Sequence, residues 1–336
     1  GARVIKIERP GGEDMRFHGP IVGTGATAIS AYYAMLNRGK EIVTADLKAK
    51  DAIDRLRPLI ESADVVLEQF RPGVMDRLGF GWEALRAINP RLIFCSISGY
   101  GASGPRASAP GHDLNYQATT GALAIAKVPD GEPAMPGTLT ADIAGGTFPA
   151  VINILLALLQ REKTGRGSRI DIAMTDAMLT FGFFSQAQGA ATGRFPEPGE
   201  PIFVGSLPRY SLYRTKDARL LAVGALEDKF WLAFCDVIEL PADLRDDHAT
   251  PVETRAAVAE RVAARSHAEW TERLAGTEFC VTPVATMEEA LADPHFVARG
   301  LFDHAVSTPS GKVLPACIVP IAPQFRGEPG VVASPE

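Results

Sequence analysis

Residues 64–101 read DVVLEQFRPGVMDRLGFGWEALRAINPRLIFCSISGYG, and this stretch decides the fold class. An apolar, β-rich run (DVVLEQF) is followed by a helical stretch from Met75 to Ile88 and then by a second apolar run, RLIFCSISGYG. Two strands joined through a helix are typical of a parallel β-sheet. The segment therefore predicts a strand–helix–strand unit.

The same alternation continues toward the N-terminus. Strands are expected at RVIKIE (3–8) and EIVTADL (41–47), and helices near residues 30–39 and 51–62. This order predicts an α/β fold: a Rossmann-like large domain whose parallel sheet is covered by helices on both faces. Ligands of such sheets bind beyond the carboxyl ends of the strands. The loops that leave those ends carry Lys or Arg beside Gly or Pro, which favours an anionic ligand.

The second half predicts a smaller module. A long apolar helix is expected over 143–161, and residues 192–210 (TGRFPEPGEPIFVGSLPRY) are dense in Pro and Gly. Beyond them, 210–226 reads as two strands joined by a tight turn, followed by helices near 228–238, 251–266 and 267–276. We expect a large domain at 1–190, a linker at 191–210, an inserted α+β domain at 211–298 and a return to the large domain at 299–336.

Composition narrows the function classes. The chain has 336 residues, 46% of them hydrophobic, and a formal charge of −6, so nucleic acid and anionic membrane are not expected partners. The most apolar window, 145–160, contains Pro149 and Asn153 and is expected to be a buried core helix rather than a membrane span. The four cysteines lack CxxC spacing, so neither a metal site nor a disulfide framework is expected. Free cysteines are typical of a reducing compartment, and we expect a cytoplasmic location.

Phosphate-binding motifs are weak. GTGATA at residues 23–28 lacks the third glycine of a dinucleotide fingerprint, and KTGRGS at 163–168 lacks the P-loop spacing.

Two acid/base candidates are ambiguous when taken alone. His112 and Asp142 each precede an apolar helical segment, where capping the helix start is the ordinary role.

Five blocks carry a resemblance: VIKIERPGGED (4–14), NRGKEIVTADLK (37–48), residues 63–105, residues 157–179, and CVTPVATMEEALADPHFVARG (280–300). Together they resemble the family III CoA-transferases, the group that contains formyl-CoA transferase, carnitine CoA-transferase and α-methylacyl-CoA racemase. Within that family GHDLNY (111–116) and VGALEDKFW (223–231) resemble the racemase branch. Transferase members usually keep the aspartate but lack this histidine.

The resemblance implies roles and an assembly. His112 and Asp142 would be the acid/base pair, and Glu227 would orient His112 from the other chain of an interlocked homodimer. It also implies a strand and helix ahead of Gly1, so we expect the first Rossmann unit to be incomplete in this sequence. Residues 17–31 match no block of the family closely.

The chemistry explains why two residues are needed. Inverting the α-carbon of a thioester requires a base on one face and an acid on the other, and histidine, with an unperturbed pKa of about 6.5, suits one of these roles. Backbone N–H groups at the start of the Asp142 helix are expected to stabilise the enolate oxygen, and Gly145 and Gly146 to let the ligand approach. We expect racemisation or epimerisation of a 2-methylacyl-CoA in lipid metabolism, without metal or redox cofactor.

Two alternatives stay open. In a CoA-transferase, Asp142 would instead attack the thioester and pass through an acyl anhydride and an aspartyl-CoA thioester. A catalytically silent acyl-CoA-binding protein would keep the fold and the basic loops alone.

The expected substrate carries coenzyme A, whose phosphates need basic groups. Arg9, Lys48, Arg71 and Arg77 lie in loops or helix starts at the predicted ligand edge, and the resemblance supports Arg9 and Arg77 most. For Lys48 and Arg71 an ordinary solvated charge is an equal interpretation. Asp113, next to His112, is a second-tier candidate that would cap a helix or orient a neighbour.

Overall fold

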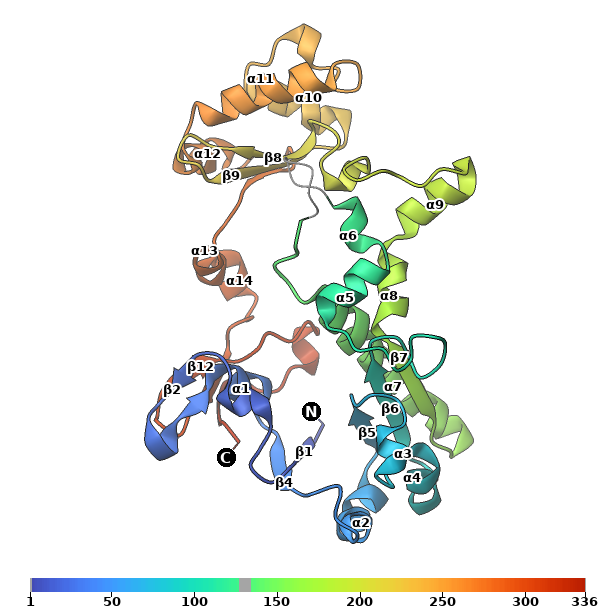
Figure 1. The fold of residues 1–336 in the computed structure, drawn as a ribbon. Helices are drawn as coiled ribbons and strands as arrows, with labels where there is room; N and C mark the ends of the chain where they lie inside the picture. Colours follow the sequence, from blue (N-terminus) through green and yellow to red (C-terminus); the bar gives the residue numbers. More distant parts are fainter. Residues whose placement is uncertain (1, 127–133, 336) are drawn as a thin grey trace. The chain divides into compact units, whose positions relative to one another are not determined.

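The computed structural model describes residues 2–126 and 134–335 (Figure 1). By their contacts the residues group into two compact units, Gly1–Leu56 with Ala285–Glu336, and Arg57–Val284. The first unit joins the two ends of the chain. The second contains the whole predicted catalytic set, His112, Asp142 and Glu227. The domain boundaries expected at 190, 210 and 298 stay a prediction.

The predicted strand–helix–strand segment forms a parallel sheet in the second unit. Strand β5 (Val65–Glu68) pairs in parallel with β6 (Ile93–Ser98), which pairs in parallel with β7 (Arg169–Ala173). The single helix expected from Met75 to Ile88 is wrong: two short helices, α3 (Val74–Arg77) and α4 (Trp82–Ile88), replace it. Two glycines cause the break, because Gly79 takes a left-handed φ of 81° and a Cβ on Gly81 would collide with the Asp76 carboxylate.

One face of this sheet is covered by the long apolar helix α7 (Phe148–Thr164). Ala150 of the helix packs on Cys95 and Ile172 of the sheet. The helix ends at Gly165, whose φ of 71° forms a left-handed C-cap. A π-helical stretch, Ala141–Thr147, leads directly into α7, so the helical region starts before the predicted residue 143.

The prediction that the apolar helix is buried is wrong for the side of α7 that faces away from the sheet. The side chains of Leu155, Leu156 and Leu159 are 56%, 58% and 65% exposed, because only the opposite side of α7 meets the sheet. By length and composition alone, the stretch Ala141–Thr164 is long and apolar enough to cross a membrane, and 22% of its most apolar window is buried. The absence of a membrane partner therefore stays a prediction.

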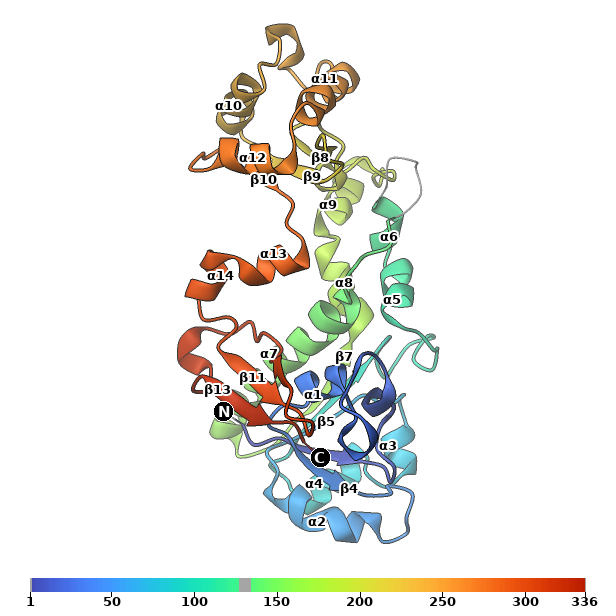
Figure 2. The same ribbon diagram turned by 90° about the vertical axis from the view of Figure 1, so that its left-hand side faces the viewer.

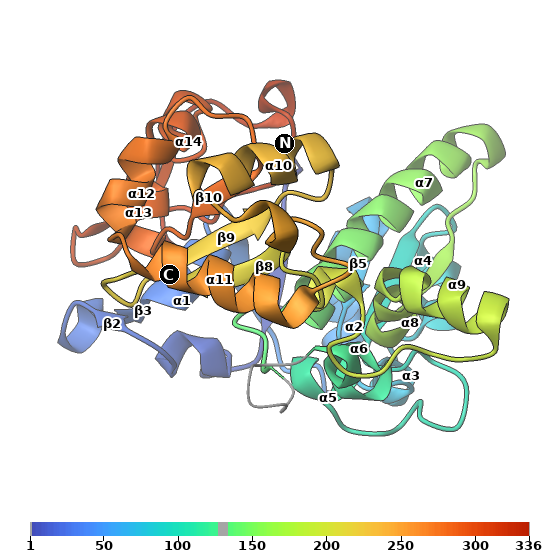
Figure 3. The same cartoon turned by 90° about the horizontal axis from the view of Figure 1, so that it is seen from above.

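The expected α+β module is present in the same unit. Strands β8 (Tyr210–Arg214), β9 (Leu220–Gly224) and β10 (Val281–Pro283) form an antiparallel sheet, and the predicted two strands with a tight turn are confirmed. The helices that gather around it (Figure 3) are α10 (Asp228–Val237), α11 (Pro251–Ala263) and α12 (His267–Leu274). Their apolar faces share one core with the sheet that contains Trp231, Phe234 and Trp270.

Four further helices complete this unit. They are α5 (Asp113–Thr119), α6 (Ala122–Ile125), α8 (Met174–Phe181) and α9 (Phe183–Thr192).

The first unit is built from both ends of the chain. Both strands expected near the N-terminus are present, and β1 (Ile5–Glu8) pairs in parallel with β4 (Glu41–Thr44). They form a two-stranded sheet separate from β5–β6–β7, so the expectation of one parallel sheet is wrong on this point. Tyr33 of helix α1 (Ala31–Leu36) packs in a buried cluster with Val306 of the C-terminal segment. The C-terminal sheet, with β11 and β13 side by side (Figure 2), consists of β11 (His304–Ser307), β12 (Val313–Pro315) and β13 (Gly330–Ala333).

The remaining elements of the first unit are short. They are α1 (Ala31–Leu36), α13 (Met287–Ala292), α14 (Pro294–Ala298) and the hairpin β2 (Ile21–Val22) and β3 (Ile29–Ser30), whereas α2 (Ala52–Ser62) contains the boundary between the units. The hairpin occupies the region of 17–31 for which the sequence offered no motif.

Candidate active site

His112 stands where a loop enters helix α5. It is the N-cap residue, and its backbone N–H donates to Asn115 Oδ1 at 3.0 Å. The preceding loop is anchored by Tyr116, whose hydroxyl donates to the carbonyl of Gly111 at 2.6 Å. The His112 side chain is exposed. The backbone of His112 thus takes the capping position, while its imidazole remains open to a ligand.

Asp142 lies inside a helix rather than at its cap. It is the second residue of the π-helical stretch Ala141–Thr147, and π-helical turns occur frequently at functional sites. Its side chain is half-buried, and burial raises the pKa of the Asp142 carboxyl, as does the nearby Asp113 carboxylate. His112 acts on the same pKa in the opposite direction. The structure therefore brings His112 and Asp142 within electrostatic range of each other.

Asp113 connects these two residues. Its carboxylate is buried, accepts a hydrogen bond from the side-chain amide of Gln117, and accepts another from the backbone N–H of Asp142 at 2.9 Å. The N–H of Ile143 is also used, donating to the carbonyl of Leu139 at 3.1 Å. The prediction that the start of the Asp142 helix stabilises an enolate is therefore wrong for these two N–H groups.

Gly145 and Gly146 serve packing rather than ligand approach. Both are buried, and a Cβ on Gly145 would lie 2.7 Å from the carbonyl oxygen of Met174. A Cβ on Gly146 would lie 3.0 Å from Met174 Cγ and 3.3 Å from Ile97 Cγ2. The two glycines let the π-helical stretch lie directly on α8 and β6, which corrects the expectation from sequence.

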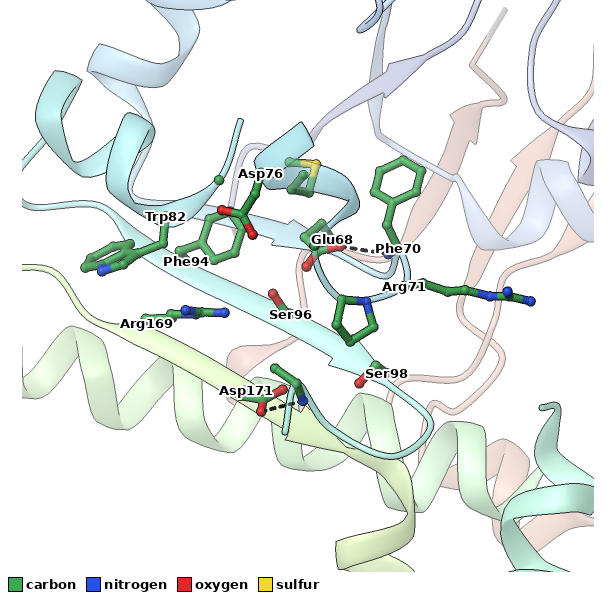
Figure 4. A pocket seen from close by; sticks show the side chains of 15 residues that line it. Glu68, Phe70, Arg71, Asp76, Trp82, Phe94, Ser96, Ser98, Arg169 and Asp171 are labelled. Carbon is green, nitrogen blue, oxygen red and sulfur yellow. Dashed lines mark hydrogen bonds between the residues drawn. The ribbon is translucent and has the colours of Figure 1, made fainter. Parts of the chain in front are cut away.

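A pocket lies between the second face of the parallel sheet and helices α3 and α4. It is small and partly open to solvent. Figure 4 shows its polar lining, which includes Glu68, Asp76, Ser96, Ser98, Arg169 and Asp171. Because β-strand side chains alternate, this face is the reverse of the apolar face under α7.

Backbone amides hold two of the pocket carboxylates. Glu68 accepts from the N–H of Phe70 at 2.7 Å, and Asp171 accepts from the N–H of Ala102 at 2.8 Å (Figure 4). Burial raises the pKa of the Glu68 carboxyl. Within the described part of the chain, the buried hydroxyl of Ser98 has no hydrogen-bond partner. The pocket thus offers both acceptors and donors to a polar ligand group.

Arg71 and Arg77 lie beside this pocket. Arg71 lines it, but its side chain extends away from Glu68 and Asp171 (Figure 4). Burial and Asp142 raise the pKa of the Tyr116 phenol, whereas Arg71 lowers it, so Arg71 and Asp142 both act on one hydroxyl. Arg77 is exposed on α3. Its guanidinium lies over Gly73, which lines the pocket, because a Cβ on Gly73 would lie 3.3 Å from Arg77 Nη1. Both guanidinium groups are accessible to an anionic ligand.

The other two predicted CoA contacts belong to the first unit. Arg9 is exposed, donates from Nε to the carbonyl of Gly12 at 2.8 Å and pairs with Asp14. Lys48 is exposed in the turn after β4, where its backbone N–H donates to Asp46 Oδ1 at 2.9 Å. Their roles stay predictions.

Glu227 is the N-cap residue of α10, and its side chain is exposed. Its carboxylate makes no hydrogen bond or ion pair with the residues that the structure describes. Arg209 fixes the turn around it, since Nη1 donates to the carbonyl of Leu226 at 3.1 Å and to Asp228 Oδ1 at 2.6 Å. No contact joins Glu227 to His112 among the described residues, so their pairing across chains stays a prediction.

The sequence model of CoA-transferase family III matches residues 1–336. The chain belongs to CoA-transferase family III. Human alpha-methylacyl-CoA racemase is 34% identical over 338 residues, which cover 98% of this chain and 83% of that protein. Acetyl-CoA:oxalate CoA-transferase of Acetobacter aceti is 36% identical over 315 residues, which cover 90% and 78% of the two chains.

Solved structures agree with this assignment. A CAIB/BAIF family protein from Brucella suis superimposes with a TM-score of 0.83 at 30% identity, covering 100% of this chain and 89% of that one. The fold is therefore the mixed α/β fold of this family, with parallel sheets, and the chain is an enzyme of the family III CoA-transferase/racemase group.

Sequence reasoning left two features of this family III site unassigned. The Asp113–Gln117 hydrogen bond has a sequence signal, because residues four apart lie on one side of a helix. The unpartnered Ser98 hydroxyl has no such signal, since only the folded sheet shows which hydroxyls find a partner.

Proposed function

We propose that this family III enzyme inverts the α-carbon of a 2-methylacyl-CoA by proton transfer between two residues. The observation that carries the proposal is the hydrogen bond from the Asp142 N–H to Asp113, which ties the half-buried Asp142 to the residue that follows His112. An imidazole and a carboxylic acid are both effective proton carriers near neutral pH when the pKa of the carboxyl is raised. Racemases among the relatives support the same reaction.

The proposed reaction conserves the thioester bond. In one direction Asp142 removes the α-proton, and the electron pair of the C–H bond moves onto the thioester oxygen to form an enolate. The enolate carbon then takes a proton from His112 on the opposite face. The reverse direction exchanges the two roles. Glu227 of the partner subunit would orient the imidazole through a charged hydrogen bond.

Substrate binding follows from charge. Arg9, Lys48, Arg71 and Arg77 would bind the phosphates of coenzyme A, and no other cofactor is proposed. A homodimer is supported by the exposed leucines of α7, because contiguous apolar surface usually marks an interface. A Rossmann-like arrangement of the large domain, a cytoplasmic location and a role in lipid metabolism belong to the same proposal.

The alternative is transfer of CoA to a free carboxylic acid, and relatives with that activity support it. The Asp142 carboxylate would attack the acyl carbonyl, the C–S bond would break and an anhydride would form. The CoA thiolate would then attack the aspartyl carbonyl and release the first acid, leaving an aspartyl-CoA thioester. The acceptor carboxylate would attack this thioester and displace the CoA thiolate, which would attack the acceptor carbonyl of the new anhydride to give the product thioester and free Asp142. This route gives the neighbouring His112 no proton to transfer, which is why racemisation is preferred.

Solvent deuterium distinguishes the candidates. Purified enzyme, incubated in D₂O with a 2-methylacyl-CoA and no acceptor acid, is expected to incorporate deuterium at the α-carbon and to lose optical rotation. His112→Ala is expected to abolish racemisation, whereas His248→Ala, which removes another exposed histidine, leaves it unchanged. Acceptor-dependent exchange with a hydroxylamine-trappable aspartyl thioester would establish the transferase instead. Substrate binding without either reaction would establish a silent acyl-CoA-binding protein.

A further inference from the structure

Asp113 is a buried carboxylate next to the proposed acid/base pair. Its side chain is 6% exposed, although it follows the exposed His112 directly in the chain. Both carboxylate oxygens are used, Oδ1 by the Gln117 amide and Oδ2 by the backbone N–H of Asp142. A buried carboxylate with a fixed donor on each oxygen has little freedom to rotate.

We propose that Asp113 is the positioning residue of this site, and that its carboxylate fixes the start of the Asp142 helix against α5 and thereby sets the separation of His112 and Asp142. The expected effect on turnover rests on the proposed function. The hydrogen bonds of Asp113 are features of the folded chain and do not depend on which reaction the enzyme catalyses.

The geometry explains why one carboxylate has this effect. The first N–H groups of a helix lack partners within the helix and carry its positive dipole end. Asp113 satisfies one of them from a neighbouring helix, so the Asp142 backbone is tied to the residue that follows His112. The two glycines behind Asp142 pack on Met174 and close the opposite side. Loss of Asp113 would therefore release the helix start on the side that faces His112.

Charge adds a second consequence. The ionisable groups that act on the pKa of Asp142 are Asp113 and His112, and Asp142 in turn raises the pKa of the Tyr116 phenol. All three neighbours belong to α5 or its cap. After burial, Asp113 is the main reason that the pKa of Asp142 is raised, and His112 opposes it. A neutral residue at 113 is thus expected to lower the pKa of Asp142, while an amide oxygen still accepts the N–H bond.

Two variants separate position from charge. Asp113→Asn keeps an acceptor and removes the charge, so the acidic limb of the pH profile for α-deuterium exchange is expected to move to lower pH. Asp113→Ala removes the acceptor, and kcat is expected to fall on the order of tenfold to a hundredfold with KM little changed. Asp176→Asn, an exposed aspartate on α8, is the matched control and moves neither quantity.

A readout without turnover keeps this inference separate from the proposed function. ¹³C-carboxyl NMR of aspartate-labelled protein, with Asp142 assigned through Asp142→Asn, is expected to show its titration at lower pH in Asp113→Asn than in wild type. This titration tests the charge effect, whereas amide hydrogen exchange tests the position. In Asp113→Ala the Asp142 N–H loses its acceptor and is expected to exchange faster than in wild type, and unchanged exchange overturns the inference, whether or not the enzyme turns over a 2-methylacyl-CoA. Wild-type protein without α-exchange overturns the proposed function alone. If Asp113→Ala does not fold, the same exchange is measured in Asp113→Asn, whose neutral amide oxygen is a weaker acceptor and is expected to give a smaller increase.

Discussion

The turn that presents Glu227 depends on one buried ion pair, and removing that pair is a stringent test of the small module. Asp247 is 0% exposed and Arg209 is 7% exposed. Arg209 Nε donates to both carboxylate oxygens, at 2.9 and 3.0 Å, and Nη2 donates to Oδ1 at 2.6 Å. The same guanidinium bonds the residues on either side of Glu227.

Among the residues that the structure describes, Asp247→Ala leaves the buried guanidinium with Asp228 as its one anionic partner. The Asp228 side chain is 83% exposed, and such a pair contributes less than about 1 kcal/mol. Breaking a buried pair by removing one partner costs about 3–5 kcal/mol, and we expect the lower end, about 3 kcal/mol. The turn around Glu227 then loosens, so the rate of the proposed racemisation is expected to fall as well.

Native-state hydrogen exchange of the β8 and β9 amides is the appropriate assay, because it reports the opening of this module alone. A loss of about 3 kcal/mol speeds their exchange about a hundredfold. The control is the double variant Arg209→Met, Asp247→Leu, which removes both charges and is expected to recover most of the loss. Exchange in Asp247→Ala within about threefold of wild type would refute the reasoning.

Three further predictions concern the site and the loop near Arg9. Because burial and Asp113 raise the pKa of Asp142, the folded protein loses stability as pH rises from the unfolded-state pKa, about 4, through the raised pKa. Asp142→Asn is therefore expected to be inactive, yet to melt at a higher temperature than wild type at pH 7 and at the same temperature well below about pH 4. A lower melting temperature than wild type at pH 7 would contradict this. Burial raises the pKa of Glu8, but hydrogen bonds from Arg16, Tyr33 and Lys6 lower it to about 2. Glu8→Gln is therefore expected to lower the melting temperature at neutral pH, and the difference from wild type is expected to shrink as pH falls from about 4.5 toward about 2. A difference that does not change with pH would contradict the stabilising role of these hydrogen bonds. Gly145→Ala forces a Cβ against a backbone carbonyl and is expected to cost about 1–3 kcal/mol in chemical denaturation and to slow turnover, and a fully active, equally stable variant would exclude the proposed packing.

The fold was predictable where apolar periodicity is strong. The runs around Val65 and Ile93 gave correct strands, because a buried parallel strand has a continuous apolar signature. The break between α3 and α4 was missed, since it depends on a contact between Gly81 and the Asp76 side chain. The exposed side of α7 was also missed, because hydrophobicity does not reveal whether a surface is covered within the same chain.

The candidate site, like the fold, was predicted correctly in part and wrongly in part. Residue types and the family resemblance selected His112 and Asp142, and in the structure the Asp142 N–H is hydrogen-bonded to Asp113, the residue that follows His112. The roles assigned to the Asp142 N–H and to Gly145 were wrong, because backbone donors and glycines are used by whatever packs against them. Periodicity carries no information about those tertiary partners.

The most direct test of two-residue proton transfer follows each substrate enantiomer separately. Pure (R)- and (S)-2-methylacyl-CoA are incubated in D₂O with His112→Ala and with Asp142→Asn, and α-deuterium is followed by NMR. Neither variant is expected to racemise, and each is expected to retain exchange with only the enantiomer whose α-hydrogen faces the remaining base, so the two variants act on opposite enantiomers. Residual exchange by both variants on the same enantiomer, or full racemisation by either, would contradict the mechanism.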